Sequence, residues 1–298
     1  ALADCLHDFV RKIWENGGAV PELPAGWLDA VLEALYKNKG DYNSFDNWRG
    51  IVLLDVLSKI VNILINWRLQ AAGEAIWGEE QHGFRKNKGT ADCIFTIRRL
   101  AEEFGSTVPE NSTDDRLYLL FVDLKKAFDS CDRSLIWALL DRCGVPANVV
   151  ALVRAFHDGF GAMPFFRGEL GARFDITTGV RQGCCCGPTL WNFYFFFVMW
   201  LWRDRCTAAI PSFGVSLAFR RDLRVRTRGK LLAMRTNETA RLTDLQYADD
   251  TATMCRDFHT FQRSAEILDT TDRQFGGEIS LTKTEWMCIP HATPPAPL

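Results

Sequence analysis

The chain has 298 residues, of which 47% are hydrophobic and 24% are charged, and its formal net charge is −2 at pH 7. These values are ordinary for a folded globular protein and exclude a chain that is disordered throughout. The near-neutral balance gives no support to nucleic-acid binding, which would have to depend on local basic surfaces.

The cysteines do not form a recognisable framework. The chain holds ten cysteines and five histidines, without a Cys-x-x-Cys pair or histidines at zinc-ligand spacing. We therefore expect reduced, mostly buried thiols in an intracellular protein. We also expect no signal peptide. The longest apolar run, Leu190 to Trp202, is shorter than the ~20 residues that cross a bilayer, so we expect a buried helix and no membrane partner.

The first part of the chain, residues 1–104, is predicted to be mainly helical. One helix is expected after Pro24 and Gly26, a second at 56–69 and a third at 90–104. The apolar positions that indicate the first two are Leu28, Val31, Leu32 and Leu35, and then Ile60, Ile63, Leu64 and Trp67. Residues 105–115 are predicted to form a polar loop.

The middle of the chain alternates between expected strands and helices. The apolar run 117–124 predicts a central strand. Asp132 is a suitable N-cap for the helix that follows, and Gly144 is a suitable end. A second helix is expected at 148–156 and a strand at 174–180.

The last part of the chain contains a predicted hairpin. Gly183 and Gly187 border a turn, and Pro188 suits the first turn of a helix. Residues 242–247 and 251–255 are predicted to be strands joined at Ala248-Asp-Asp250. The proline-rich residues 290–298 are expected to form a linker.

Two segments place carboxylates at the ends of apolar strands: Phe121-Val-Asp-Leu-Lys-Lys-Ala-Phe-Asp129 and Tyr247-Ala-Asp-Asp250. Burying such groups is costly unless a cation balances them, and Mg²⁺ does this well. Asp123, Asp249 and Asp250 could together hold two ions ~4 Å apart for an in-line displacement at phosphorus. A solvated Asp-Asp turn is the alternative for the second segment alone.

A basic stretch near residue 225 is the second candidate for contact with nucleic acid. Arg224, Arg226, Arg228 and Lys230 alternate, so on a strand they share one face. Such a face could follow a phosphate backbone and make binding sensitive to salt. A solvated hairpin is an equally good interpretation.

The chain resembles reverse transcriptases of non-LTR (LINE-like) retrotransposons in six ordered blocks, which cover roughly residues 20–288. The two carboxylate segments resemble motifs A and C. The other blocks are Asn47-Trp-Arg-Gly-Ile51 with Ser58-Lys-Ile60, Gln81-His-Gly-Phe-Arg85 with Gly89-Thr-Ala-Asp92, Gly179-Val-Arg-Gln-Gly183 with Pro188 (motif B), and Gly277-Glu-Ile-Ser-Leu-Thr-Lys-Thr284 (motif D). Two departures are the run Cys184-Cys-Cys186 and Ser280, where the family usually has other residues.

The resemblance implies an α+β, right-hand polymerase fold. Residues 1–115 would form a mainly helical fingers region, and 116–289 the palm, an antiparallel sheet backed by helices. Residues 147–175 would partly connect the two, and 290–298 would be a tail. The resemblance also implies that this stretch lacks a thumb, and that endonuclease and thumb regions belong to a full-length polyprotein.

The resemblance also assigns roles to individual residues. Asp123, Asp249 and Asp250, with the Leu124 carbonyl, would hold two Mg²⁺ ions, for which Mn²⁺ could substitute. Residues expected to contact the deoxynucleotide are Arg49, Lys59, Leu124, Phe128, Gln182 and Gly183. Phe128 would exclude a ribose 2′-hydroxyl, although Phe is more often a core residue.

Several basic residues keep two interpretations. Lys59, like Arg68, could grip the triphosphate or be a solvated helix residue. Arg85 could contact the template or stabilise the fingers. Lys283 could be a general acid for pyrophosphate or a surface lysine. Asp129 is expected to be structural.

The implied function is RNA-directed DNA synthesis, in which a dNTP is joined to a primer 3′-hydroxyl. The partners would be an RNA template, a DNA primer and dNTPs, and the expected location is the nucleus, at the site of integration. The alternative is a catalytically inactive, nucleic-acid-binding remnant of such an element. An RNA-synthesising polymerase is a third possibility, against which Phe128 argues.

Overall fold

The structure, a computed structural model, describes residues 2–15, 22–24, 26–105, 116–166, 168–181, 183–220 and 237–290. The chain divides into two units that interleave along the sequence. The first unit comprises Ala1–Gly78, Lys126–Phe197 and Phe275–Gly277, and the second comprises Glu79–Lys125, Val198–Gln274 and Glu278–Leu298. The units do not follow a single boundary at residues 115/116, and the division into fingers and palm stays a prediction.

The first unit is built on a sheet in the order β2-β1-β4-β5, with β6 also paired to β4. Strand β1 pairs antiparallel with β2 and parallel with β4. Its elements are α1 (Leu2–Trp14), β1 (Asp29–Tyr36), η1 (Phe45–Asn47), β2 (Trp48–Leu53), α2 (Val56–Glu74), α4 (Ala127–Ser130), α5 (Arg133–Arg142), α6 (Ala147–His157), β4 (Gly161–Phe166), β5 (Glu169–Leu170) and β6 (Phe174–Asp175).

The helix predicted after Gly26 is wrong, because this segment forms strand β1. Val31 and Leu35 are four residues apart, which places them on one face of a helix but also on one face of a strand. Val31 lies opposite Leu53 and Leu35 lies opposite Arg49. Since β1 has partners on both edges, hydrogen bonds from distant segments satisfy its backbone. The local pattern could not reveal those partners.

Helix α2 lies where it was predicted, but it buries a different face. Asp55 caps it, because its Oδ1 accepts hydrogen bonds from the amides of Leu57 and Ser58 at 2.8 and 3.0 Å. Trp67, expected inside, is 62% exposed. The buried side chains are instead Ser58, Val61, Asn62, Ile65 and Leu69.

The buried face of α2 tolerates polar residues because they have partners. The Asn62 amide donates to the Ser58 carbonyl at 2.8 Å. The side-chain Oδ1 of Asn62 accepts a hydrogen bond from the thiol of Cys184 at 3.1 Å. The backbone carbonyl of Asn62 accepts one from the thiol of Cys186 at 3.0 Å. Satisfied hydrogen bonds remove the cost of burying Asn62, so an apolar pattern alone selects the wrong face.

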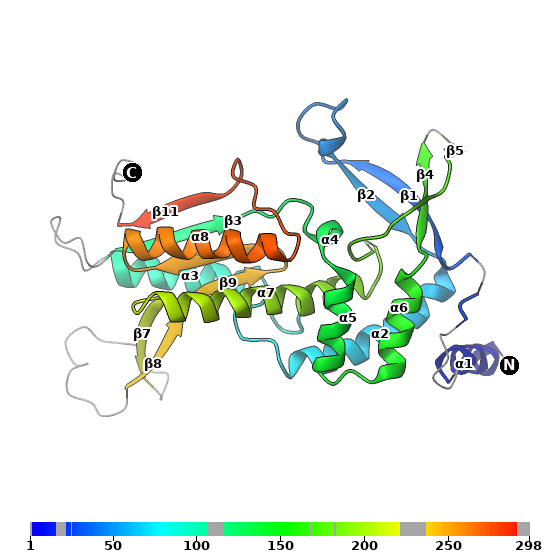
Figure 1. Ribbon diagram of the computed structural model, residues 1–298, viewed down its shortest axis with the longest axis horizontal. Helices are drawn as coiled ribbons and strands as arrows, with labels where there is room; N and C mark the ends of the chain where they lie inside the picture. Colours follow the sequence, from blue (N-terminus) through cyan, green and yellow to red (C-terminus); the bar gives the residue numbers. More distant parts are fainter. Residues whose placement is uncertain are drawn as a thin grey trace. The chain divides into compact units, whose positions relative to one another are not determined.

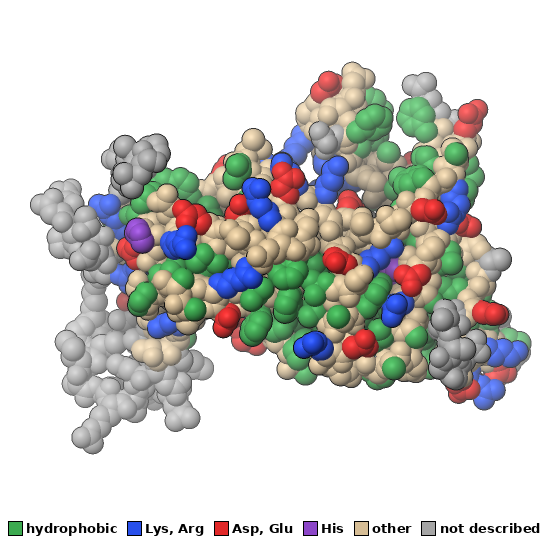
Figure 2. Space-filling view, in the orientation of Figure 1, with side chains coloured by type: hydrophobic (Ala, Val, Ile, Leu, Met, Phe, Trp, Pro, Cys, Tyr) green, Lys and Arg blue, Asp and Glu red, His purple; other side chains and the backbone are tan. Residues whose placement is uncertain are grey.

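Other elements of the first unit follow their sequence signals. Asp132 caps α5 by accepting from the Ser134 amide at 2.7 Å. Gly144 follows the helix with φ +76°, the left-handed conformation that glycine adopts freely. The strand expected at 174–180 is shorter, because only β6 at its start is paired. Hydrophobic side chains gather at the outer ends of the β1–β2 and β4–β5 hairpins (Figure 2), where Phe45 is 93% and Phe166 is 62% exposed.

Helix α7 (Gly187–Ala209) starts in the first unit and ends in the second. It contains the apolar run predicted to be a buried helix, and Trp191 and Trp202 are almost fully buried. Within the described ranges, no helix is long and apolar enough to cross a membrane. All ten cysteines are free and six of them are buried, as expected.

The second unit is built on a four-stranded antiparallel sheet in the order β11-β3-β10-β9. An antiparallel sheet backed by helices was predicted for this part of the fold. Its elements are α3 (Thr90–Gly105), β3 (Leu117–Val122), β9 (Asp244–Tyr247), β10 (Asp250–Cys255), α8 (Phe258–Gln274) and β11 (Glu285–Ile289), with a separate hairpin of β7 (Val215–Arg220) and β8 (Asn237–Leu242).

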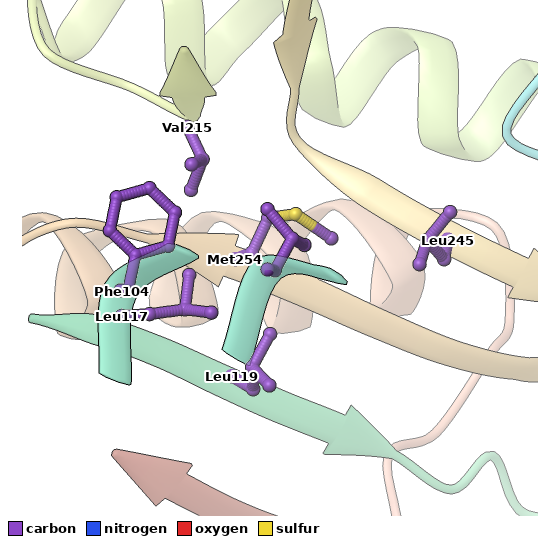
Figure 3. Packing of buried hydrophobic residues seen from close by; sticks show 7 residues of the cluster. Phe104, Leu117, Leu119, Val215, Leu245 and Met254 are labelled. Carbon is purple, nitrogen blue, oxygen red and sulfur yellow. The ribbon is translucent and has the colours of Figure 1, made fainter. Parts of the chain in front are cut away.

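Strand β3 is apolar at every position because both faces of the sheet are covered (Figure 1). On one face Leu117 and Leu119 pack with Met254 of β10 and with Leu100 and Phe104 of α3; all except Leu100 are labelled in Figure 3. On the other face, the ring of Tyr118 lies 5.7 Å from those of Phe258 and Phe261, at the start of α8. The strand end that carries Asp123 is therefore anchored from both sides.

Two of the predicted segments lie outside the described residues. They are most of the polar loop, at 106–115, and the proline-rich tail from 291 onward.

Candidate active site

The acidic turn is the connection between β9 and β10. Tyr247 lies opposite Asp250 in this hairpin, and Ala248 at the turn has φ +60°. On the other side of β10, Thr251 pairs with Val122 of β3. Continuing this register by one residue sets Asp123 opposite Asp250. The fold therefore brings one acid from β3 next to two acids of the turn.

The charges of these three carboxylates act on one another. Burial raises the pKa of Asp249 above its ordinary value, and the charges of Asp250 and Asp123 raise it further. The pKa of Asp250 is also raised, first by burial and then by the charge of Asp123. A nearby cation favours the ionised form of carboxylates that are partly buried and mutually repelling. Their oxygens are also the donors that Mg²⁺ and Mn²⁺ prefer.

Lys283 supplies one positive charge at this place. Its Nζ donates to Oδ2 of Asp123 at 3.3 Å, and the two side chains are 65% and 34% exposed. The segment that carries it is fixed to the end of β3, because the Ser280 amide donates to the Asp123 carbonyl at 2.8 Å. The Thr284 hydroxyl accepts from the Asp123 amide at 3.2 Å. Ser280 makes its contact through the backbone, so the departure from the usual residue does not disturb it.

The Leu124 carbonyl is directed toward the β10 side of its strand. Leu124 forms a bridge with Ile279, and the hydrogen bonds on that edge use the neighbouring Asp123 carbonyl and Lys125 amide. In an antiparallel pair, the residue between two such bonds directs its own carbonyl to the opposite edge. This edge is the one that faces the acidic turn.

A pocket of about 290 Å³ adjoins the carboxylates, and Asp123, Asp250 and Lys283 line it together with Tyr247 and Phe121. Asp249 is not among its lining residues. Among the described side chains, no three of His, Cys, Asp or Glu converge closely enough to hold a metal ion. The oxygen donors of Asp123, Asp249 and Asp250 nevertheless fit the chemistry of divalent ions. A larger hollow of about 730 Å³, near His259 and Arg263, contains none of the predicted site residues.

Two of the residues predicted to contact the nucleotide are held firmly in the first unit. The half-buried ring of Phe128 lies 5.2 Å from that of Trp191. Gly183 has φ +101°, and a Cβ there would lie 2.5 Å from the Val52 carbonyl oxygen, so a larger residue would clash. Gln182, the motif B residue directly before this glycine, lies outside the described residues.

The predicted basic residues fall into different settings. Arg49 is exposed on β2, and Lys59 is half-buried on α2. Arg68 is exposed on α2, where it donates to the Leu64 carbonyl at 3.0 Å and lies 4.3 Å from the Trp14 ring. Arg85 is buried and donates to the Gln81 carbonyl at 3.2 Å, which favours stabilisation of its own segment over template contact. The residues Arg224, Arg226, Arg228 and Lys230 lie outside the described residues.

One residue that bears on the site was missed by the sequence analysis. The buried side chain of Gln81 bonds to both peptide groups of Ala248, directly before the acidic turn. Gln81 opens the second fingers block of the sequence, but nothing in the sequence indicates that it contacts Ala248, 167 positions away.

Comparison with known proteins gives one family match. Residues 36–295 match the model described as "Reverse transcriptase (RNA-dependent DNA polymerase)". A 149 kDa protein of transposon TX1 from Xenopus laevis is 28% identical over 209 residues, which are 70% of this chain and 15% of that protein. The probable RNA-directed DNA polymerase from transposon X-element of Drosophila melanogaster is 26% identical over 178 residues, with coverages of 57% and 18%. The chain spans less than a fifth of the length of these two relatives.

Solved structures with a similar fold include telomerases. Apo telomerase from Candida tropicalis, truncated from its C-terminal domain, aligns with a TM-score of 0.59 and 12% identity, over 98% of this chain and 56% of that one. Telomerase from the same organism in complex with the TWJ fragment of telomeric RNA aligns with a TM-score of 0.59 and 11% identity, with coverages of 96% and 44%. At this identity the likeness shows the fold alone.

Proposed function

The chain belongs to the reverse transcriptase (RNA-dependent DNA polymerase) family, and on that premise we propose that it is the catalytic core of a retrotransposon polymerase. Its reaction would join a dNTP to the 3′-hydroxyl of a DNA primer that is paired with an RNA template. The observation that carries this proposal is the position of Asp123 beside the Asp249-Asp250 turn, in a sheet that fixes all three.

Reverse transcriptases use divalent metal ions, and Mg²⁺ or Mn²⁺ fits the oxygen donors of this site. Asp123, Asp249 and Asp250 would hold two such ions, with the Leu124 carbonyl as a further oxygen ligand. When bound, the ions supply activation of the 3′-hydroxyl and charge stabilisation at the phosphates. The raised pKa values of Asp249 and Asp250 support this assignment, since a divalent cation would relieve their repulsion.

Residues of the first unit would bind the nucleotide. Phe128, braced by Trp191, would exclude the ribose 2′-hydroxyl. Arg49 is exposed on β2, opposite Leu35 of β1, so its guanidinium is suited to bidentate phosphate binding. Lys59 would add a point charge, Gln182 would touch nucleotide and template, and Gly183 would let the backbone approach them closely.

The remaining assignments concern partners. Lys283, beside Asp123, is a candidate general acid for the pyrophosphate. The basic stretch at Arg224, Arg226, Arg228 and Lys230 would follow a phosphate backbone, and Arg85 would hold the fingers segment. The relatives are much longer, so thumb and endonuclease regions would come from the rest of a polyprotein that acts in the nucleus.

A single-nucleotide extension assay tests the enzyme against an inactive nucleic-acid-binding remnant. The chain is given a primed RNA template or a matched DNA template, with Mg²⁺ or Mn²⁺. We expect extension on RNA, and a loss of at least ~10³-fold in Asp249→Asn, because metal-bound charge stabilisation contributes several kcal/mol. Asp204→Asn, an exposed aspartate of α7, is the matched control and should extend normally. Binding of the primed template without extension by the parent chain would instead favour the remnant.

A further inference from the structure

The acidic turn depends on an alanine in an unusual backbone conformation. Ala248, directly before Asp249, has φ +60°. Residues other than glycine adopt this left-handed region with a conformational penalty, and they keep it only where surrounding contacts hold them there. Asp249 and Asp250 follow at once, so the conformation of Ala248 sets the direction in which both carboxylates leave the turn.

The side chain that holds Ala248 belongs to Gln81. Its Oε1 accepts a hydrogen bond from the Ala248 amide at 3.0 Å, and its Nε2 donates to the Ala248 carbonyl at 3.2 Å. Gln81 is only 5% exposed, so water does not compete freely for these bonds. A single side chain therefore satisfies both backbone groups of the strained residue.

The segment around Gln81 packs closely against the turn at Ala248. Its Oε1 also accepts from the Gly83 amide at 2.7 Å. A Cβ on Gly83 would lie 2.1 Å from the Ala248 nitrogen, so only glycine permits this approach. The backbone of the segment is paired with β9, because the His82 amide donates to the Gln246 carbonyl and the Gln246 amide donates to the Glu80 carbonyl, both at 2.8 Å.

A buried chain of hydrogen bonds fixes the Gln81 amide in turn. Gln81 Nε2 donates to Oε1 of Gln246 at 3.2 Å, and Gln246 Nε2 donates to Oδ2 of Asp244 at 2.6 Å. Arg203 then bonds to both oxygens of Asp244 at 3.1 Å, and Asp244 is fully buried. Because the Asp244 carboxylate can only accept hydrogen bonds, it fixes the orientation of the Gln246 side-chain amide. Gln246 in turn fixes the orientation of the Gln81 side-chain amide.

We propose that Gln81 is a positioning residue for the catalytic turn: it holds Ala248 in the left-handed conformation and thereby aims Asp249 and Asp250. The inference deepens the proposed polymerase function and rests on it for its effect on catalysis. The geometric part, that Gln81 fixes the turn, stands independently of activity.

Two substitutions test the proposal. Gln81→Met keeps the length of the side chain and removes its hydrogen bonds. Ala248→Gly removes the need for the clamp, because glycine adopts the left-handed region without penalty. Thr271→Val is the matched control, since it removes an equally buried polar group from α8, which contributes no residue to these hydrogen bonds.

In Gln81→Met we expect kcat for single-nucleotide extension to fall about 100-fold, with KM for the dNTP within about threefold, because a misaimed group costs the reaction step more than binding. Mn²⁺ binding, followed by water-proton relaxation, should weaken about tenfold. Hydrogen exchange at the Ala248 and Gly83 amides should accelerate. The double variant Gln81→Met/Ala248→Gly should recover at least about tenfold in kcat, and Thr271→Val should change none of these readouts.

The proposal is overturned if folded Gln81→Met keeps its amide protection and Mn²⁺ affinity, or if Ala248→Gly recovers nothing in its background. If Gln81→Met does not fold, Gln81→Asn, one methylene shorter, carries the same test. If the parent chain shows no extension, the proposed function fails, while amide exchange and Mn²⁺ binding still decide whether Gln81 positions the turn.

Discussion

At the scale of single residues, the site is defined by charges that the protein balances only in part. Lys283 contacts Asp123, while burial and mutual repulsion raise the pKa of Asp249 and Asp250. A folded domain tolerates such an arrangement at a cost in stability, and a functional site is the usual reason to keep it. Phe128 belongs to the same motif A, five residues after Asp123, and its aromatic ring is half-buried.

Phe128→Val is predicted to lower discrimination against ribonucleotides by about 10- to 100-fold, because a smaller side chain leaves room for the 2′-hydroxyl. The measurement is the ratio of kcat/KM for a dNTP and the matching rNTP. Phe195→Val is the control, since Phe195 stacks on the same Trp191 at 5.1 Å and its loss weakens packing alone. Equal discrimination in the Phe128 variant and the parent chain contradicts the role.

Asp272 gives a pH-dependent prediction that is separate from the site. It lies buried in α8 with Oδ2 lacking a partner among the described residues, and burial followed by the charge of Asp269 raises its pKa to about 6. A raised pKa means that the folded state binds the proton more tightly than the unfolded state. The stability of the parent chain should therefore increase as pH falls from about 7 toward 4.

Asp272→Asn should remove this dependence. We expect its free energy of unfolding to exceed that of the parent chain by about 3 kcal/mol above pH 7, with the difference disappearing near pH 4. Urea unfolding at several pH values measures both. Asp204→Asn, exposed on α7, should keep the pH dependence of the parent chain. An equal gain of Asp272→Asn at all pH values would exclude ionisation of Asp272 as the cause.

At the scale of elements, local signals predicted some structures and not others. The apolar run of β3, the hairpin of β9 and β10, and the Asp132 cap of α5 are properties of short segments and were predicted correctly. The helix predicted at strand β1 is wrong, because the hydrogen-bond partners of this segment in β2 and β4 lie elsewhere in the sequence. The buried face of α2 was also wrong, since thiols more than 120 positions away satisfy Asn62.

The N-cap of α2 offers a test at this scale. Asp55→Ala should lower the free energy of unfolding by about 1 kcal/mol, because the amides of Leu57 and Ser58 lose their acceptor. Thermal or urea unfolding measures the change. Asp141→Ala, in the last turn of α5 where a carboxylate opposes the helix dipole, should have little effect or a slight stabilising one. An equal loss in both variants would contradict the capping role.

At the scale of the whole molecule, the family was predicted from the sequence and confirmed by comparison. Six blocks in a fixed order identify it, even though no single block does. The sequence also predicted the α+β fold with an antiparallel sheet, and telomerase structures share this fold. The contact of Gln81 with Ala248 could not be predicted, since it joins blocks 167 positions apart. The order of the blocks along the sequence identifies the family, whereas contacts that hold the site, such as that of Gln81 with Ala248, appear only in the structure.

The central claim is that Asp123 shares divalent ions with Asp249 and Asp250, and Mn²⁺ binding followed by electron paramagnetic resonance tests it most directly. The parent chain should bind Mn²⁺, and Asp123→Asn, Asp249→Asn and Asp250→Asn should each weaken binding by about tenfold or more, since each removes a charged ligand. Asp204→Asn should bind like the parent chain. Undiminished binding by Asp123→Asn, with losses in the other two, would contradict a site shared across β3 and β10.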